Sequence, residues 1–109
     1  MKERVYKLEI FLPEDHKEEI FQALWSVDAG HIGKYDRCLS WSRVNSCWHP
    51  LDDSRPFHGA PGEITWAEEI KVEVCCLKSR VADTITAVKQ AHPYEEPVIN
   101  VLPLAGTGL

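Results

Sequence analysis

The sequence predicts a single α+β domain over residues 1–109, because its segments alternate between strand and helix periodicity in the order strand, helix, strand, strand, helix, strand. That order is the split βαβ pattern of a ferredoxin-like domain, βαββαβ, with an antiparallel four-stranded sheet. Right-handed crossovers place both helices on one face of such a sheet. A length of 109 residues with 44% hydrophobic residues suits one core and is too short for two.

The first strand and the first helix follow from the N-terminal part of the sequence. Apolar and charged residues alternate over residues 6–12, and Pro13 ends the alternation. Asp15 followed by Glu18 resembles a capping box, and apolar residues then recur at helical spacing. The pattern therefore predicts a helix over residues 15–27.

Glycine and proline divide the middle of the chain. Two glycines in residues 29–33 predict a helix C-cap and a turn, and residues 35–44 have strand character. Residues 45–62 carry the longest run of loop signals and are expected to form a long hairpin loop. Because long structureless loops are often functional, this segment is a candidate lid, binding loop or oligomer arm. Strict alternation over residues 69–77 predicts the next strand.

The last two elements complete the sheet and leave one of its faces open. Ser79 is expected to cap a second helix with an apolar face, and residues 98–104 form a final short strand. With both helices on one face, the other face must meet something else, and an uncovered apolar face is an association surface. The apolar side chains that we assign to the open face are Val5, Leu39, Trp41, Ile99 and Val101.

Charge and composition limit the partners. The net charge is −5, from 17 acidic and 12 basic residues, and this argues against nucleic acid because phosphate binding requires a basic surface. The sequence has no apolar stretch of signal-peptide or transmembrane length, so we expect a cytoplasmic protein without a membrane partner. The four cysteines are interpreted as reduced thiols.

The candidate site centres on the segment from Ala91 to Pro97, which places an imidazole, a phenol and two carboxylates between two prolines. Topology brings this segment to the same rim of the sheet as residues 13–16 and 48–62, while the turn with His31 lies at the opposite rim. The residues predicted to bind a ligand at this rim are His92, Tyr94, Glu95, Glu96, His49 and His58.

Two interpretations of this rim stay open. His92 and Glu95 could bind a divalent metal with help from the loop histidines, since imidazole and carboxylate suit Zn²⁺ or a similar ion. In the other interpretation the segment is a structural elbow, in which Glu95 or Glu96 accepts backbone hydrogen bonds and Tyr94 packs. Any cofactor beyond a divalent metal is unknown, and no residue is assigned a catalytic role.

Several motifs together resemble, in order, the insertion domain of YqfO-like proteins in the Nif-three-like dinuclear-metal family, which is related by name to a GTP cyclohydrolase. The resemblance implies a ferredoxin-like fold similar to CutA and the PII signalling proteins, which commonly form trimers. Relative to that family, the sequence lacks the flanking metal-binding halves and also the Gly/Thr-rich segment expected before the Arg-Pro dipeptide. The hydrolase activity of the family is therefore not assigned to this chain. The motifs lie at residues 30–38, Arg55-Pro56, Gly59, Gly62-Glu63, Glu69, Glu73 and 91–97.

The leading functional hypothesis is a non-enzymatic, homo-oligomeric binding or regulatory module that stands alone, with a trimer favoured by the resemblance and a dimer as the fallback. The alternative comes from another class of protein. It is a divalent-metal-binding protein or small metal-dependent hydrolase that uses the rim formed by His92, Glu95 and Glu96.

Overall fold

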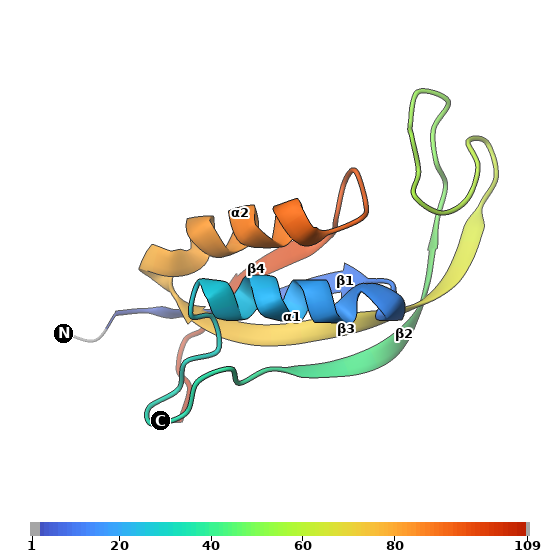
Figure 1. Ribbon diagram of the computed structural model, residues 1–109. Helices are drawn as coiled ribbons and strands as arrows, with labels where there is room; N and C mark the ends of the chain where they lie inside the picture. Colours follow the sequence, from blue (N-terminus) through green and yellow to red (C-terminus); the bar gives the residue numbers. More distant parts are fainter. Residues whose placement is uncertain (1–2, 109) are drawn as a thin grey trace.

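A computed structural model describes residues 3–108 and confirms the predicted α+β class. The four strands form one antiparallel sheet in the order β2-β3-β1-β4, and both helices cover the same face (Figure 1). Two short 3-10 turns, Glu14–His16 and Lys78–Arg80, lead into the helices. The elements are β1 (Val5–Leu12), α1 (Lys17–Ser26), β2 (Ser40–Trp48), β3 (Thr65–Leu77), α2 (Val81–Ala91) and β4 (Ile99–Pro103).

The core lies between the sheet and the two helices. In β1 and β3 every second side chain points to the helices, and cross-strand partners such as Ile10 and Val72 share that face. The helices add apolar side chains at helical spacing, so one contiguous core results. Its fully buried members are Leu8, Ile10, Leu12, Ile20, Leu24, Ile70, Val72 and Val88.

The hairpin of β2 and β3 extends beyond the rest of the sheet. Pairing between β1 and β3 ends at Leu12 and Ile70, whereas β2 and β3 remain paired as far as Trp48 and Thr65. We call this projecting part, residues 44–69, the arm. It bends toward the side of the sheet that carries the helices (Figure 1). The loop itself covers residues 49–64, so part of the predicted 45–62 loop is strand.

The second strand begins later than the sequence predicts. Residues 35–39 are outside the strand, and backbone bonds between Ile32 and Tyr35 close a turn there. Arg37 has a φ of 58°, which is incompatible with an extended strand. The chain reaches the sheet at Ser40 and then stays extended for nine residues.

Neither predicted side-chain cap is present. The α1 helix begins at Lys17 after the turn at Glu14–His16, and no side chain caps its N-terminus. Asp15 instead lies 3.1 Å from Nδ1 of His16. Ser79 lies in the turn before α2, where its backbone N–H donates a 2.6 Å hydrogen bond to Oε1 of Glu3. Proline before the first turn and contacts with the N-terminal segment therefore replace the predicted caps.

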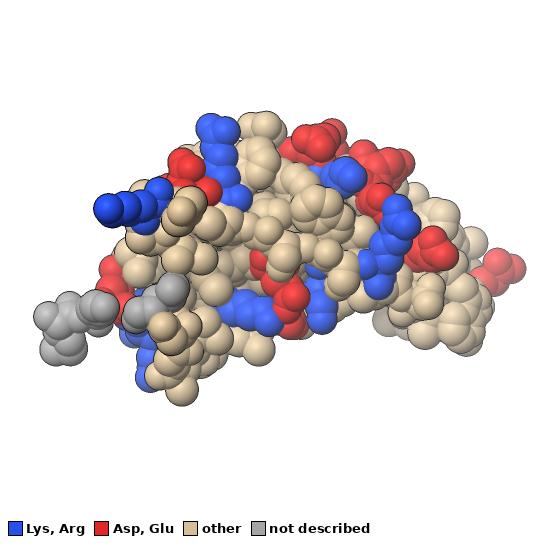
Figure 2. Space-filling view, turned by 90° about the horizontal axis from the view of Figure 1, so that it is seen from below, with Lys and Arg blue, Asp and Glu red and all other residues tan. Residues whose placement is uncertain are grey.

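The open face of the sheet is mixed rather than apolar, since Leu77 and Leu102 are exposed there beside charged side chains, and most of the apolar residues that we assigned to it lie elsewhere. Trp41, Ile99 and Val101 pair directly with core residues of β3 and β1, so they point toward the helices, and Leu39 packs against the core. Of the five predicted residues, Val5 alone has open-face parity. Lys7 occupies the middle of this face and forms ion pairs with Glu73 and Glu9. The view from below shows acidic and basic side chains interspersed (Figure 2).

Candidate functional site

The proline-flanked segment lies at the rim where α2 ends. Pro93 disfavours helical geometry in the residue before it, and His92 accordingly has an extended backbone with φ −82° and ψ 135°. The His92 backbone N–H still donates to the Val88 carbonyl at 2.9 Å, which closes the last helical turn. The side chain of His92 is thereby directed into the end of the sheet.

Both ring nitrogens of His92 are used inside the protein. Nε2 lies 2.7 Å from the Phe11 carbonyl, which can only accept, so Nε2 carries the proton. Nδ1 accepts from the Tyr94 backbone N–H at 3.1 Å. The side chain is 8% exposed, and this burial lowers the pKa of His92, so the neutral ring is favoured.

Tyr94 contacts several other residues at this rim. Its hydroxyl donates a 2.7 Å hydrogen bond to Oε2 of Glu69, and its ring centroid lies 5.8 Å from that of Trp48 and 5.9 Å from that of Phe57. Burial raises the pKa of the Tyr94 phenol, and the bond to Glu69 adds to the rise. The phenol therefore stays protonated and serves as a fixed donor, rather than as a proton acceptor.

Glu95 ties the loop of the arm to the rim. Its Oε1 accepts a 2.7 Å hydrogen bond from the backbone N–H of Arg55. The turn after β1 joins from the third side, since the His16 ring meets Phe57 edge-on at a centroid distance of 5.3 Å. The predicted convergence of three separate segments at one rim is therefore confirmed.

The turn containing His31 lies at the other end of the sheet. Gly30 donates its N–H to the Cys75 carbonyl at 2.8 Å, and Cys75 pairs with Lys7, near the start of β1. Nδ1 of His31 lies 3.0 Å from Oδ2 of Asp28, at the end of the sheet away from the rim that carries His92.

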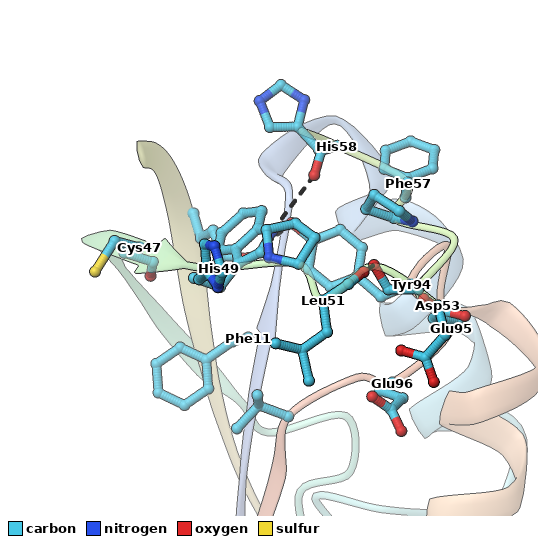
Figure 3. A pocket seen from close by; sticks show the side chains of 17 residues that line it. Phe11, Cys47, His49, Leu51, Asp53, Phe57, His58, Tyr94, Glu95 and Glu96 are labelled. Atoms are coloured by element: carbon cyan, nitrogen blue, oxygen red, sulfur yellow. Dashed lines mark hydrogen bonds between the residues drawn. The ribbon is translucent and has the colours of Figure 1, made fainter. Parts of the chain in front are cut away.

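A cavity of about 620 Å³ opens between the arm and the rim (Figure 3). Of the six residues predicted to bind a ligand, five line it and the sixth, His92, lies behind Tyr94 with its ring centroid 4.8 Å away. We call this cavity the rim pocket. The five lining residues are His49, His58, Tyr94, Glu95 and Glu96.

The geometry of the rim favours the elbow over the metal site. Residues 3–108 contain no group of three or more His, Cys, Asp or Glu side chains placed to hold a metal ion. His92 has no free lone pair for a metal, because Nδ1 already accepts a hydrogen bond. Glu95 accepts a backbone hydrogen bond and Tyr94 packs against rings, which are the contacts that the elbow interpretation expects.

Sequence reasoning missed several residues of this pocket. The alternation over residues 69–77 places Glu69 among the charged residues of a strand, which suggests an exposed side chain. Glu69 is nevertheless only 5% exposed, because it lies at the base of the arm, just beyond the end of β1. Phe57 and Phe11 also line the cavity. Glu69 and Tyr94 are 25 residues apart, and no local pattern signals their contact. Trp48 could be found, since an aromatic at the mouth of a long loop suggests an anchor.

Comparisons with known proteins match the chain to a part of longer proteins. No family model matches it. The GTP cyclohydrolase 1 type 2 homolog of Halalkalibacterium halodurans is 35% identical over 106 residues, which cover 97% of this chain and 28% of that protein. The crystal structure of a Bacillus cereus protein related to NIF3 is 33% identical with a TM-score of 0.84, over 95% of this chain and 26% of that one.

More distant solved structures share the fold. CutA from Archaeoglobus fulgidus superposes with a TM-score of 0.70 at 20% identity, over 94% of this chain and 86% of that one. Bacillus subtilis GlnK, a PII-like protein, gives 0.65 at 19% identity, with the same coverage of both chains. These likenesses establish the CutA/PII-like form of the predicted ferredoxin-like fold.

The chain spans about a quarter of the length of the curated relatives that it matches. The match nevertheless runs through nearly all of this chain, and the NIF3-related structure superposes over the same extent. The chain is therefore homologous to one domain-sized segment of the NIF3-related GTP cyclohydrolase 1 type 2 homologs, and it has their CutA/PII-like fold.

Proposed function

We propose that this chain is a non-enzymatic, homo-oligomeric binding or regulatory module whose arm makes the contact between copies. A trimer is the expected assembly, and a dimer is the alternative. The observation that carries the proposal is the exposure of large apolar side chains on the arm. Among the described residues nine such side chains are exposed, and four belong to the arm: Leu51 and Phe57, which also line the rim pocket, and Ile64 and Trp66, which do not.

The two faces of the arm differ in a way that supports this proposal. Trp48 pairs with Thr65 and faces the rim pocket, where it packs near Tyr94. Trp66 pairs with Cys47, so it lies on the opposite face, and it is 74% exposed. A two-stranded ribbon is marginally stable by itself, and large aromatic side chains are enriched in protein interfaces. The uncovered face of the arm therefore suits a second copy of the chain.

The rim favours binding over catalysis. Neither nitrogen of His92 is free to take or give a proton, and Tyr94 is held as a donor to Glu69. A general base must reach the proton that it removes, and these groups are already engaged. The activity of the full-length cyclohydrolase homologs is not extended to this chain.

The described thiols fit the cytoplasmic location that we propose. Cys38, Cys47, Cys75 and Cys76 are all free. Over residues 3–108, no helix combines the length and the apolar character needed to cross a membrane.

Two matched variants test the role of the arm. Trp66→Glu places a charge on the proposed contact face, and Tyr35→Glu places the same charge on a side chain that is equally exposed at 74%. Tyr35 lies in the turn at the opposite end of the sheet, so it serves as the control. We expect size-exclusion chromatography with light scattering to give a smaller particle for Trp66→Glu and an unchanged one for Tyr35→Glu. Equal masses for the two variants would argue against an interface through the arm.

A further inference from the structure

We propose that the rim pocket binds a small organic cation through an ammonium or guanidinium group. The inference rests on the proposed function as a binding module and adds the chemical class of its ligand. Three independent features of the pocket carry it: the sign of the charges that line it, the state of one buried carboxylate and the arrangement of its aromatic rings.

The charges that line the pocket have one sign. Asp53, Glu69, Glu95 and Glu96 line it, and no lysine or arginine is among its lining residues. Figure 3 shows Asp53, Glu95 and Glu96 on the same side of the cavity. Arg55 lies in sequence between two lining residues, Ser54 and Pro56, but it is not a lining residue itself. Its contact with Glu95 is made by the backbone N–H and not by the guanidinium. The pocket therefore attracts cations and repels anions.

Glu69 is a nearly buried carboxylate without a cationic partner. It is 5% exposed, its Oε2 accepts the Tyr94 hydroxyl, and no hydrogen bond or ion pair reaches Oε1 within residues 3–108. Two other carboxylates do have a cationic partner in the chain: Glu73 of β3 pairs with Lys7, and Glu14 in the turn after β1 pairs with Arg43. Among the described residues the one buried side-chain polar atom without a partner is Nε1 of Trp25, so Oε1 of Glu69 keeps contact with solvent. An accessible, unpaired carboxylate oxygen in a mostly apolar cavity can pair with a cation from outside the chain.

Aromatic rings form a cluster in the pocket wall beside this carboxylate. Tyr94 lies between Trp48 and Phe57, with centroid distances of 5.8 and 5.9 Å, and all three line the pocket. The negative faces of aromatic rings attract organic cations, and the attraction grows when the cation is desolvated. A cavity of about 620 Å³ also suits a small organic molecule, and its apolar walls suit a cation with a carbon chain.

Isosteric probes test the charge requirement directly. Arginine amide and citrulline amide have nearly the same shape, but the first carries a guanidinium and the second a neutral urea group. We expect isothermal titration calorimetry on the intact chain to detect binding of arginine amide, with citrulline amide at least tenfold weaker. A charge-assisted hydrogen bond is the source of that difference.

A pair of neighbouring variants locates the site. Glu69→Gln keeps the size of the side chain and an acceptor for Tyr94 but removes the charge, whereas Glu68→Gln changes a residue on the opposite face of β3. We expect affinity for arginine amide to fall roughly tenfold in Glu69→Gln and to stay unchanged in Glu68→Gln. Circular dichroism of both variants checks that they fold.

The possible results separate this proposal from the proposed function. Equal binding of the two amides, or unchanged affinity in Glu69→Gln, would overturn the cation site. Absence of arginine amide binding, together with a smaller oligomer in Glu69→Gln, would also overturn it and assign the carboxylate to a side chain of a second copy. Selective binding by a chain that sediments as a monomer would support the cation site while refuting the oligomeric module.

Discussion

The hydroxyl of Tyr94 donates a 2.7 Å hydrogen bond to Oε2 of Glu69, across 25 residues of sequence. This bond joins the connection between α2 and β4 to the base of the arm. Glu69 is 5% exposed, so the bond satisfies one oxygen of a carboxylate that water reaches poorly. The bond and the rings around it fix the arm against the body of the domain.

Replacing Tyr94 with phenylalanine tests the value of this bond. The ring contacts remain, but the nearly buried carboxylate of Glu69 loses its donor. We expect Tyr94→Phe to lower the free energy of unfolding by about 1–3 kcal/mol in urea titrations. Tyr35→Phe is the control, because Tyr35 is 74% exposed, and it should change stability little. Equal effects of the two changes would mean that the Tyr94 bond does not stabilise the rim.

The lowered pKa of His92 predicts how the free energy of unfolding responds to acid. Burial lowers the pKa of His92 in the folded state; the Phe11 carbonyl and Glu69 oppose the shift, and His16 adds to it. As the pH falls below about 6.5, the unfolded chain takes up a proton before the folded chain does. The contribution of His92 is therefore fully present above that pH and declines as the pH falls toward the lowered folded pKa.

The measurement is the free energy of unfolding at pH 7.5 and at pH 5.5 for wild type and His92→Gln. Glutamine can still donate to Phe11 but does not titrate, so we expect a smaller acid-induced loss in the variant. His31→Gln is the contrasting control, because Asp28 raises the pKa of His31 and protonation there favours the folded state. Its acid-induced loss should be larger than that of wild type. An unchanged acid response in His92→Gln would contradict the assignment.

Gly30 is expected to be intolerant of a side chain. Its φ is +85°, and a Cβ at this position would collide with the backbone carbonyl of Cys38. We expect Gly30→Ala to cost about 2 kcal/mol or more, from strain and from the displaced segment. Gly33→Ala is the matched control, since its φ is +58° but nothing lies within 4 Å of the added Cβ. Urea titration should rank Gly30→Ala as clearly more destabilising, and the reverse order would contradict the packing described for this turn.

The core of the fold was predictable because its signals are local. Leu8, Ile10 and Leu12 alternate with polar residues, and Val72 and Val74 do the same in β3, so each strand shows its buried face in its own sequence. The order of the elements then fixes the ends at which the connections meet, and this placed the rim correctly.

The arm and the open face were not predictable in the same way. Residues 40–48 are exposed or half-buried, so the strand from Ser40 to Trp48 lacks the apolar alternation that reveals a strand. The facing of Ile99 and Val101 depends on register, and a shift of one residue reverses every side chain. The role of Glu69 likewise depends on where β1 stops beside β3.

Sedimentation velocity of the unmodified chain tests the central claim most directly. The exposed face of the arm, which carries Trp66, is proposed to join copies of the chain. The account predicts a species with three times the mass of the chain, or twice in the alternative assembly, that persists through the micromolar range. A single monomeric species across that whole range would contradict it.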